Sequence, residues 1–366
     1  MKINDICSYA PKSQIKAGDA CADGVYVFFT SSADENKRYS DYQLDGEGIV
    51  MGTGGNATLH YYNGKFAVST DCIVLLPDNR VKCKYLYYFF KKNIHILEAG
   101  FKGAGLRHTN KGYIGNINFG DIPSHEKQKR VILALDSVQQ IIDARQQQLA
   151  KLDDLIKARF VEMFGDSENN NKAWPVKSLD KLCTVGSSKR VYQSEQSSTG
   201  VPFWRISDLV SKMDTGIVDS TLFISKKKYI ELKQDGLVPV PGDILVTSRG
   251  TLGRCYIIKE EDCFYFQDGM ISWLSNYSKE IAPLYLQYLF TMSGFRKQID
   301  KMQAGSTVAY LSITMLKRLQ VMVPDKELQE QFATFIAQVD KSKVAVQKVL
   351  DEAQLLFDSL MQQYFG

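Results

Sequence analysis

The chain has 366 residues, of which 44% are hydrophobic and 11% aromatic, and its formal net charge at pH 7 is +4. This length suffices for two ordinary domains that each bury a core, and no apolar stretch approaches the roughly 20 residues of a membrane span. The opening MKINDICSYA lacks the basic and then apolar run of a signal peptide, so we expect a globular, cytoplasmic protein. The small net charge does not by itself indicate nucleic-acid binding.

The cysteines argue against a disulfide framework and against a zinc site. They are seven in number, an odd count, and none of them forms a C-x-x-C pair. This pattern favours reduced, buried thiols. The cysteines are Cys7, Cys21, Cys72, Cys83, Cys183, Cys255 and Cys263.

Residues 1–122 are expected to form a first head of mixed α and β structure, called head 1. Short apolar runs predict strands, the tyrosine-rich run near 82–98 predicts a helix, and Gly-, Ser- and Asn-rich turns separate them. The predicted strands are VYVFF (25–29), EGIVM (47–51), FAVS (66–69) and CIVLL (72–76).

Residues 123–165 predict a long helix. It begins after Pro123 with the capping-type residue Ser124 and ends at Phe164 and Gly165, where a helix C-terminus favours glycine. Its seam positions step alternately by 4 and 3, which is the pattern of a heptad helix. The seam residues are Val131, Leu135, Val138, Ile142, Arg145, Leu149, Leu152, Ile156, Arg159 and Met163.

A polar linker (166–173) precedes a second head (174–323), called head 2, and a second long helix (324–366). Head 2 is expected to contain the strand DILVT (243–247) and a helix near 283–302. The second long helix repeats the first without a gap, because Pro123 and Pro324 lie 201 positions apart, as do Phe164 and Phe365. Its seam residues are Phe332, Ile336, Val339, Lys343, Val346, Leu350, Ala353, Phe357, Leu360 and Tyr364.

Each long helix, about 60 Å at 1.5 Å per residue, carries an apolar stripe that it cannot bury alone. We therefore expect the two helices to pack on each other. Separate bundles and an inter-chain coiled coil are the alternatives. The polar seam residues Arg145, Arg159 and Lys343 are interpreted as register devices or as edges whose charged ends reach solvent.

The repeat continues less regularly in the heads. INDICS (3–8) matches LDKLCT (179–184) at an offset of 176, and YLYYFF (85–90) matches YLQYLF (285–290) at an offset of 200. GIVMGTGGNATLHYY (48–62) resembles DILVTSRGTLGRCYI (243–257), with Gly55 over Gly250 at an offset of 195. Insertions therefore fall in the heads while the helices keep a fixed offset, which is typical of a constant scaffold that carries two differently shaped heads.

No motif in the chain indicates catalysis. GTGG lies between predicted strands and lacks the lysine and helix of a P-loop, so it is interpreted as a hairpin turn. All four histidines lie in the first half of the chain, which excludes a repeated His-based site. Neighbouring carboxylates such as Asp153 and Asp154 are interpreted as a solvated helix face.

Both heads carry loops of small, polar and basic residues beside aromatic ones. Glycine allows close approach of a backbone to phosphates, and Arg, Asn, Gln, Ser and Thr can contact base edges. Any single loop can also be an ordinary turn. The charge distribution agrees with binding by the heads, because outside residues 126–166 and 325–366 the chain has 34 basic and 27 acidic residues. The candidate DNA-binding residues are Thr53, Asn56, Lys102 and Arg107 in head 1, and Arg205, Arg249, Thr251, Arg254 and Ser306 in head 2.

The twofold module resembles the specificity subunit of type I restriction-modification systems over essentially the full chain. The two long helices carry most of the resemblance, although the family's usual Pro-x-x-Glu-Gln helix start is altered to PSHEKQ and PDKELQEQ. Head segments add to it: YVFFTSS (26–32), GKFAVSTD (64–71), VPFWRISDL (201–209), PGDILVTSRGTLG (241–253) and GSTVAYLSITMLKRLQVMVP (305–324).

The resemblance implies an α+β fold with two target recognition domains, each followed by a long helix, and an antiparallel coiled coil between the helices. Each head would read one half of a split, asymmetric double-stranded DNA sequence, with half-sites roughly 34 to 36 Å apart. The helices would dock two methyltransferase subunits, and restriction subunits, with translocase and nuclease activity, would join that core. S-adenosylmethionine and the transfer to a flipped-out base would belong to the partner.

Two other functional classes remain open from the sequence. One is a stand-alone enzyme that acts on nucleic acid, which the missing catalytic motifs disfavour. The other is a helical scaffold whose heads bind protein.

Overall fold

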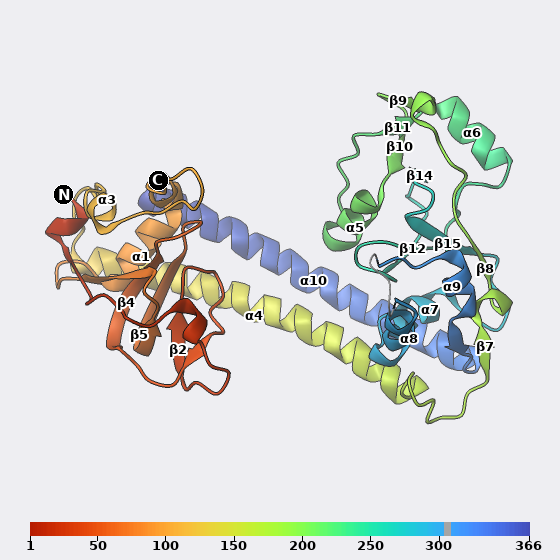
Figure 1. Cartoon of the computed structure of the whole chain (residues 1–366), viewed down its shortest axis with the longest axis horizontal. Helices are drawn as coiled ribbons and strands as arrows, with labels where there is room; N and C mark the ends of the chain where they lie inside the picture. The colour runs from red at the N-terminus through yellow and green to blue at the C-terminus, as the bar shows by residue number, and fades with distance from the viewer. Residues whose placement is uncertain (304–308) are drawn as a thin grey trace. The chain divides into compact units, whose positions relative to one another are not determined.

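The computed structural model describes residues 1–303 and 309–366, and its contacts divide the chain into two compact units. Unit 1 comprises Met1–Gln148 and Val346–Gly366, and unit 2 comprises Leu149–Ala345. Both boundaries fall inside the long helices α4 (His125–Phe164) and α10 (Lys326–Phe365). Each unit therefore contains one head and a part of each long helix (Figure 1).

Head 1 is built on one six-stranded sheet in the order β1-β6-β4-β5-β2-β3. All neighbours are antiparallel except β2 and β5. Ile49 and Met51 of β4 pack toward helix α1, while the intervening Val50 joins the cluster on the other face, as strand alternation requires. The elements are β1 (Cys7–Tyr9), β2 (Tyr26–Phe29), β3 (Arg38–Tyr39), β4 (Leu44–Gly52), β5 (Leu59–Val68), β6 (Cys72–Pro77), α1 (Cys83–Lys92), α2 (Ile94–Glu98) and α3 (Lys111–Gly115), with short 3₁₀ turns at Ile3–Asp5 and Ala17–Asp19.

Head 2 divides its strands among three sheets, with the orders β14-β10-β11-β9, β13-β12-β15-β8 and β16-β7. The strands are β7 (Val176–Ser178), β8 (Thr184–Gly186), β9 (Gln196–Ser197), β10 (Val201–Trp204), β11 (Phe223–Ile224), β12 (Ile244–Thr247), β13 (Cys255–Ile257), β14 (Tyr265–Phe266), β15 (Ile271–Ser275) and β16 (Gln320–Met322). The helices are α5 (Ile206–Thr215), α6 (Lys226–Gln234), α7 (Pro283–Leu289), α8 (Ser293–Gln303) and α9 (Ile313–Arg318), with 3₁₀ turns at Leu179–Lys181 and Gln193–Glu195. Strands β9, β10 and β11 and helices α5 and α6 all precede the glycine turn of head 2, in the region where the offset between the two copies rises from 176 to 195.

The same backbone pairing joins the first and last segments of each head. In head 1, Lys2 bridges to Asn118, and the Ile3 amide donates to the Ile117 carbonyl at 3.1 Å. In head 2, Ser178 pairs with Gln320, and the Leu179 amide donates to the Leu319 carbonyl at 2.9 Å. The start of each module is therefore fixed beside the segment that leads into its long helix.

The helices predicted near 82–98 and 283–302 are each two helices, which corrects the sequence-based assignment. Between α1 and α2, Asn93 adopts a non-helical backbone (φ −103°, ψ 36°), and its side chain donates to the Phe89 carbonyl at 3.0 Å. Between α7 and α8, the Thr291 hydroxyl donates to the Tyr288 carbonyl at 2.6 Å. Short polar side chains that bond to the backbone in this way compete with continuation of a helix.

Helices α4 and α10 pack against each other, as the sequence predicts (Figure 1). In unit 1, residues from the first part of α4 share a core with the last part of α10, and in unit 2 the last part of α4 shares a core with the first part of α10. This pairing requires antiparallel helices, so the expected antiparallel coiled coil is confirmed. The buried α4 residues are Val131, Leu135, Val138 and Ile142 in unit 1, facing Ala353, Phe357 and Met361, and Ile156, Phe160, Met163 and Phe164 in unit 2, facing Phe332, Ile336 and Val339.

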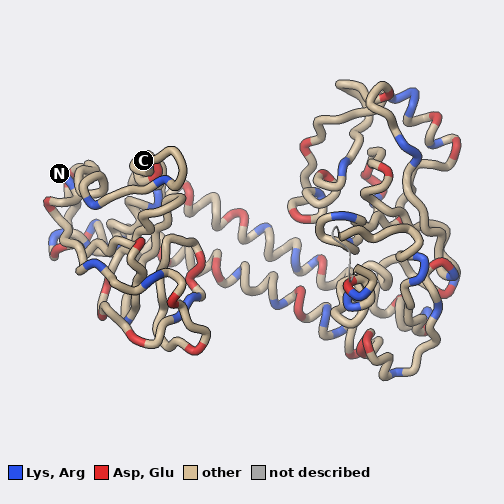
Figure 2. Tube along the Cα trace, in the orientation of Figure 1, with Lys and Arg blue, Asp and Glu red and all other residues tan. Residues whose placement is uncertain are grey.

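The remaining seam residues are less enclosed. Val346 is buried, whereas Leu149, Leu152, Leu350 and Leu360 are partly buried. Charged residues are spread along both helices (Figure 2), and most of them are exposed.

Near the C-terminal end of each helix, one buried residue lies one position after the predicted seam residue. The predicted seam residue Arg159 is partly exposed and pairs with Glu162 at 2.8 Å, while its neighbour Phe160 is fully buried. In α10 the neighbour of Leu360, Met361, is the buried residue, and Met361 lies 201 positions after Phe160. A straight α-helix has 3.6 residues per turn, so its buried face drifts away from a strict heptad. The same drift occurs in both copies.

A buried glutamine holds the start of each long helix against its head. Gln128 donates to the carbonyls of Pro123 (2.8 Å) and Arg80 (3.0 Å) and accepts from the Lys82 amide (2.7 Å). Lys82 occupies the N-cap position of α1. The side chain therefore joins the chain segment before α1 to the first turn of α4.

The second copy repeats this network with the same geometry. Gln329 donates to the carbonyls of Pro324 (2.8 Å) and Glu280 (2.9 Å) and accepts from the Ala282 amide (2.8 Å). Ala282 occupies the N-cap position of α7, as Lys82 does for α1. The two glutamines are 201 positions apart and end the altered helix starts PSHEKQ and PDKELQ.

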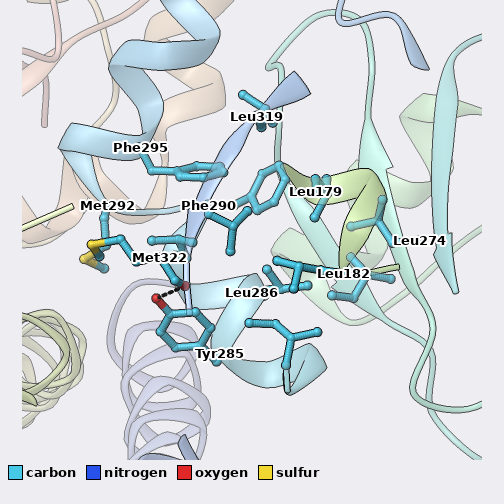
Figure 3. Packing of buried hydrophobic residues seen from close by; sticks show 14 of the residues in the cluster. Leu179, Leu182, Leu274, Tyr285, Leu286, Phe290, Met292, Phe295, Leu319 and Met322 are labelled. Carbon is cyan, nitrogen blue, oxygen red and sulfur yellow. Dashed lines mark hydrogen bonds between the residues drawn. The ribbon is translucent and has the colours of Figure 1, made fainter. Parts of the chain in front are cut away.

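The Phe-Gly end of each long helix packs into the head of its own unit. In unit 2, Phe164 of α4 lies 4.8 Å from the Tyr285 ring, and in unit 1, Phe365 of α10 lies 4.9 Å from the Tyr85 ring. Figure 3 shows the core around Tyr285, whose hydroxyl donates to the Met322 carbonyl at 3.0 Å. The first long helix thus ends in the core of head 2, and the Trp174 indole caps it by donating to the Phe164 carbonyl at 2.8 Å.

All seven cysteines are free thiols, and they differ in exposure. Cys72, Cys83 and Cys183 are buried, and burial raises the pKa of the Cys72 thiol to about 11. Cys263 is exposed, contrary to the expectation of buried thiols throughout. Within residues 1–303 and 309–366, no helix is long and apolar enough to cross a membrane, and no His, Cys, Asp and Glu group is arranged to hold a metal ion.

Replacing either buried glutamine should destabilise the unit that contains it. We expect Gln329→Ala to lower the free energy of unfolding by about 1–3 kcal/mol, because the Ala282 amide and the Glu280 carbonyl lose buried partners. Urea unfolding followed by circular dichroism measures the change. The exposed Gln147→Ala is the matched control, and an equal effect of both variants would contradict a special role for Gln329.

Candidate nucleic-acid interface

Each head presents a glycine-containing turn between two antiparallel strands. In head 1 the turn joins β4 to β5, and in head 2 it joins β12 to β13. Gly55 (φ 81°) and Gly250 (φ 68°) occupy equivalent places and have the left-handed backbone that glycine accommodates. The prediction of two equivalent hairpin turns is confirmed.

A second segment, the bridging loop, crosses each hairpin turn. The bridging loop of head 1 spans residues 102–110. Its Thr109 amide donates to the Thr53 carbonyl at 3.0 Å, and His108 forms a bridge with Gly54. The two loops of head 1 that the sequence singled out therefore form one surface.

Head 2 makes the same contact with different residues. Its bridging loop includes residues 309–312, where the Leu311 amide donates to the Ser248 carbonyl at 3.0 Å and Tyr310 forms a bridge with Arg249. The turn is thus offset by 195 (249 − 54) and the bridging loop by 202 (310 − 108). After each loop a capping side chain, Asn110 or Ser312, begins the next helix.

The four candidate residues of head 1 all lie on this surface. Arg107 and Asn56 are exposed, and the Arg107 guanidinium donates to the Asn56 side-chain carbonyl at 3.1 Å. Lys102 is exposed, and its backbone pairs with His108. The Thr53 hydroxyl is partly buried and donates to the Asp71 carbonyl at 2.9 Å, so in this state it holds the turn rather than facing outward.

Gly103 fixes the narrow base of the bridging loop in head 1. Its φ of 143° lies in the range that favours glycine, and a side chain there would place Cβ 2.7 Å from the Leu106 carbonyl oxygen. This close approach defines the conformation in which Arg107 and His108 are presented.

The candidate residues of head 2 are less tightly grouped. Arg249 and Thr251 lie exposed on the hairpin turn, and Arg254 lies where the turn leads into β13. Arg205 occupies the N-cap position of helix α5, and its guanidinium lies 3.6 Å from the Asp208 carboxylate. Ser306 lies outside the described residues.

The arginines of head 2 differ in their partners. The Arg254 guanidinium binds both oxygens of Asp214, and its hydrogen bonds hold the pKa of that carboxyl below the usual value. Arg190 pairs with Asp268 at 2.9 Å. In the part of the chain that the structure describes, Arg249 has no carboxylate within 4.0 Å, and its guanidinium carbon lies 5.3 Å from the Tyr310 ring centre. Arg249 is therefore the arginine of this turn that is not engaged by an acidic side chain among the described residues.

Arg249 and Tyr310 stand at the edge of a pocket of about 490 Å³ in head 2. Aromatic, amide and charged side chains line it, a mixture that suits a planar polar ligand such as a base edge. The lining includes Arg190, Phe203, Arg249, Gln267, Met270 and Tyr310.

The chain matches the family model of the type I restriction modification DNA specificity domain twice, over residues 1–154 and 171–354. The chain belongs to this family. As a specificity subunit it is the non-catalytic component of a type I system, and the two matches correspond to its two modules.

Individual relatives agree with the family assignment. A putative type I restriction enzyme specificity subunit of Haemophilus influenzae is 22% identical over 334 residues, which cover 88% of this chain and 82% of that protein. The type I restriction enzyme MjaVIII specificity subunit of Methanocaldococcus jannaschii is 22% identical over 308 residues, 80% of this chain and 72% of that protein.

Solved structures share the fold. The S subunit of a type I restriction-modification system from M. genitalium has a TM-score of 0.65 at 15% identity, covering 100% of this chain and 95% of that chain. A chain from a structural study of complex assembly and conformational transition in a type I system has a TM-score of 0.52 at 15% identity, covering 100% and 96%. At these identities the likeness shows the fold alone.

Sequence reasoning did not assign a role to the aromatic residues of the bridging loops. His108 and Tyr310 lie in loops that also contain candidate residues, and the 202-residue offset between them differs from the offsets of the neighbouring segments. The aromatic ring two residues before a capping Asn110 or Ser312 is the shared signal.

We expect Asp214→Asn to strengthen binding to any double-stranded DNA, because it releases the Arg254 guanidinium for a phosphate. One added phosphate contact should steepen the slope of log K against log salt by about 0.9. Fluorescence anisotropy across a salt series measures this, and the exposed Asp235→Asn is the control. Equal slopes for the two variants would place Arg254 away from the DNA.

Proposed function

We propose that this specificity subunit reads an asymmetric DNA sequence in two separated halves, one with each head. The observation that carries the proposal is the repeated contact between hairpin turn and bridging loop. The backbone of this contact is the same in both heads, while the side chains that it presents differ. A shared frame with different side chains suits two readers of different half-sites.

On head 1 the reading surface would comprise Thr53, Asn56, Lys102 and Arg107. On head 2 it would comprise Arg249 and Thr251, with Arg205, Arg254 and Ser306 contributing contacts to the DNA backbone or to neighbouring bases. Glycines at the turns allow the backbone to come close to the phosphates, and the polar side chains can reach base edges.

We further propose that helices α4 and α10 dock two methyltransferase subunits, and that restriction subunits join this core. Support comes from large apolar side chains that lie exposed on the helices, since such side chains often mark protein interfaces. They are Leu133, Ile141, Leu155 and Val161 on α4, and Val344, Val349, Leu355 and Leu356 on α10.

The methyl donor S-adenosylmethionine would be bound by the methyltransferase partner, in the cytoplasm, and this chain would supply target selection. Transfer to a base requires that the base leave the helical stack, which the partner would accomplish once the heads have positioned the DNA. A stand-alone nucleic-acid enzyme and a protein-binding scaffold are disfavoured by membership in a DNA specificity family.

Sequencing of modified bases in cells that express this chain with a methyltransferase partner tests the function. We expect a single split motif whose two halves differ, because the two turns carry different residues. The partner expressed without this chain is the control and should leave no such motif. Methyl transfer by the purified chain alone, or a partner that methylates the same motif without it, would contradict the proposal.

Exposed leucines of α10 test the docking surface. We expect Leu355→Lys combined with Leu356→Lys to weaken binding of the methyltransferase subunit at least tenfold, since two exposed apolar contacts are replaced by charges. Isothermal titration calorimetry measures the affinity. Lys348→Ala, at another exposed position of α10, is the control. Unchanged affinity with a folded double variant would place the docking surface elsewhere.

A further inference from the structure

We infer that one position of each hairpin turn, Gly54 in head 1 and Arg249 in head 2, decides which base that head selects, and that the facing aromatic residue orients the side chain at this position. The inference rests on the proposed function and names the specificity-determining position within it. The facing residues are His108 in head 1 and Tyr310 in head 2.

The equivalence of the two positions follows from backbone contacts rather than from sequence similarity. Each position directly follows the residue whose carbonyl accepts a hydrogen bond at 3.0 Å from the bridging loop, Thr53 in head 1 and Ser248 in head 2. Each position also directly precedes the left-handed glycine of its turn. Both positions bridge to the aromatic residue of the bridging loop.

In head 2 this position carries a side chain suited to guanine. Arg249 is exposed, lies over the Tyr310 ring, and opens onto the pocket lined by Gln267 and Phe203. An arginine fork can donate to both major-groove acceptors of guanine, and stacking on an aromatic ring limits the orientations of the fork before it binds. Tyr310 is therefore a positioning residue for Arg249.

In head 1 the same position is a glycine and so has no side chain, although the fold does not require glycine there. Gly54, unlike Gly55, has no positive φ, and a Cβ built on it would meet the His108 ring at 3.4 Å and 3.5 Å, which is ordinary contact. A larger residue can therefore be accommodated. Because glycine contributes no polar side chain, the exposed Asn56 and Arg107, joined by a hydrogen bond of 3.1 Å, remain to contact bases, so head 1 should read its bases with different chemistry.

Two reciprocal substitutions test the inference in the complex of this chain with its methyltransferase partner. Arg249→Gly should relax selection of one guanine in the half-site of head 2, and Gly54→Arg should add a preference for guanine in the half-site of head 1. Each change should alter discrimination roughly 5- to 150-fold, the range of one good bidentate contact. Methylated motifs and single-turnover methylation of a duplex library give the readout.

The untouched half-site serves as an internal control in each variant, because it is still read only if the chain has folded and bound DNA. Gly18→Arg places an arginine in open space on head 1, outside the hairpin turn and the bridging loop, and should leave both half-sites unchanged. If this control variant changed base selection in a half-site as much as Gly54→Arg does, the assignment would be overturned. Tyr310→Leu should relax the same guanine as Arg249→Gly, and Tyr310→Phe should restore it.

The outcomes separate the inference from the function on which it rests. If the unsubstituted complex produces no split motif, the proposed function fails. If it produces one, and both Gly54→Arg and Arg249→Gly keep the motif with the same discrimination, the inference is overturned and the function stands.

Discussion

The structure depends on the mutual burial of two apolar seams that neither long helix can cover alone. The seams meet along α4 and α10, and at each helix end a head covers what the partner helix leaves exposed. Phe164 and Phe365 illustrate this, because each lies against a tyrosine of the head at that end. A change in length between Pro123 and Phe164, or between Pro324 and Phe365, would displace a whole seam, which explains why insertions occur only in the heads.

The buried glutamines fix the position of each head along its long helix. A hydrophobic contact permits sliding, whereas Gln128 and Gln329 each satisfy three backbone groups of defined position. A slip of one residue would leave buried amides and carbonyls without partners. The orientation in which each head presents its turn is therefore tied to the helix frame of its unit.

The sequence predicted what depends on periodicity and missed what depends on tertiary contacts. The long helices, their antiparallel pairing and the equivalent hairpin turns follow from heptad spacing, glycine placement and the family resemblance. The division of head 2 into three sheets could not be predicted, because its short strands have too few residues to specify their partners. Phe160 replaced Arg159 at the seam because the drift of a straight helix accumulates with length. The candidate DNA-binding residues of the heads were proposed from composition, and the contacts of three of them with Asp214, Asp208 or Tyr310 became visible only in three dimensions.

Neighbouring glycines in one turn distinguish what the fold requires from what it leaves open. Gly55 and Gly250 have a backbone conformation that side chains rarely adopt, so both copies must keep glycine there. Gly54 is under no such constraint, and the matching place in the other head holds Arg249. A position that lies on a fixed backbone and has room for a Cβ can vary while the turn is kept. Selection for a new DNA sequence can act at such a position while the hairpin, the bridging loop and the helix frame stay unchanged.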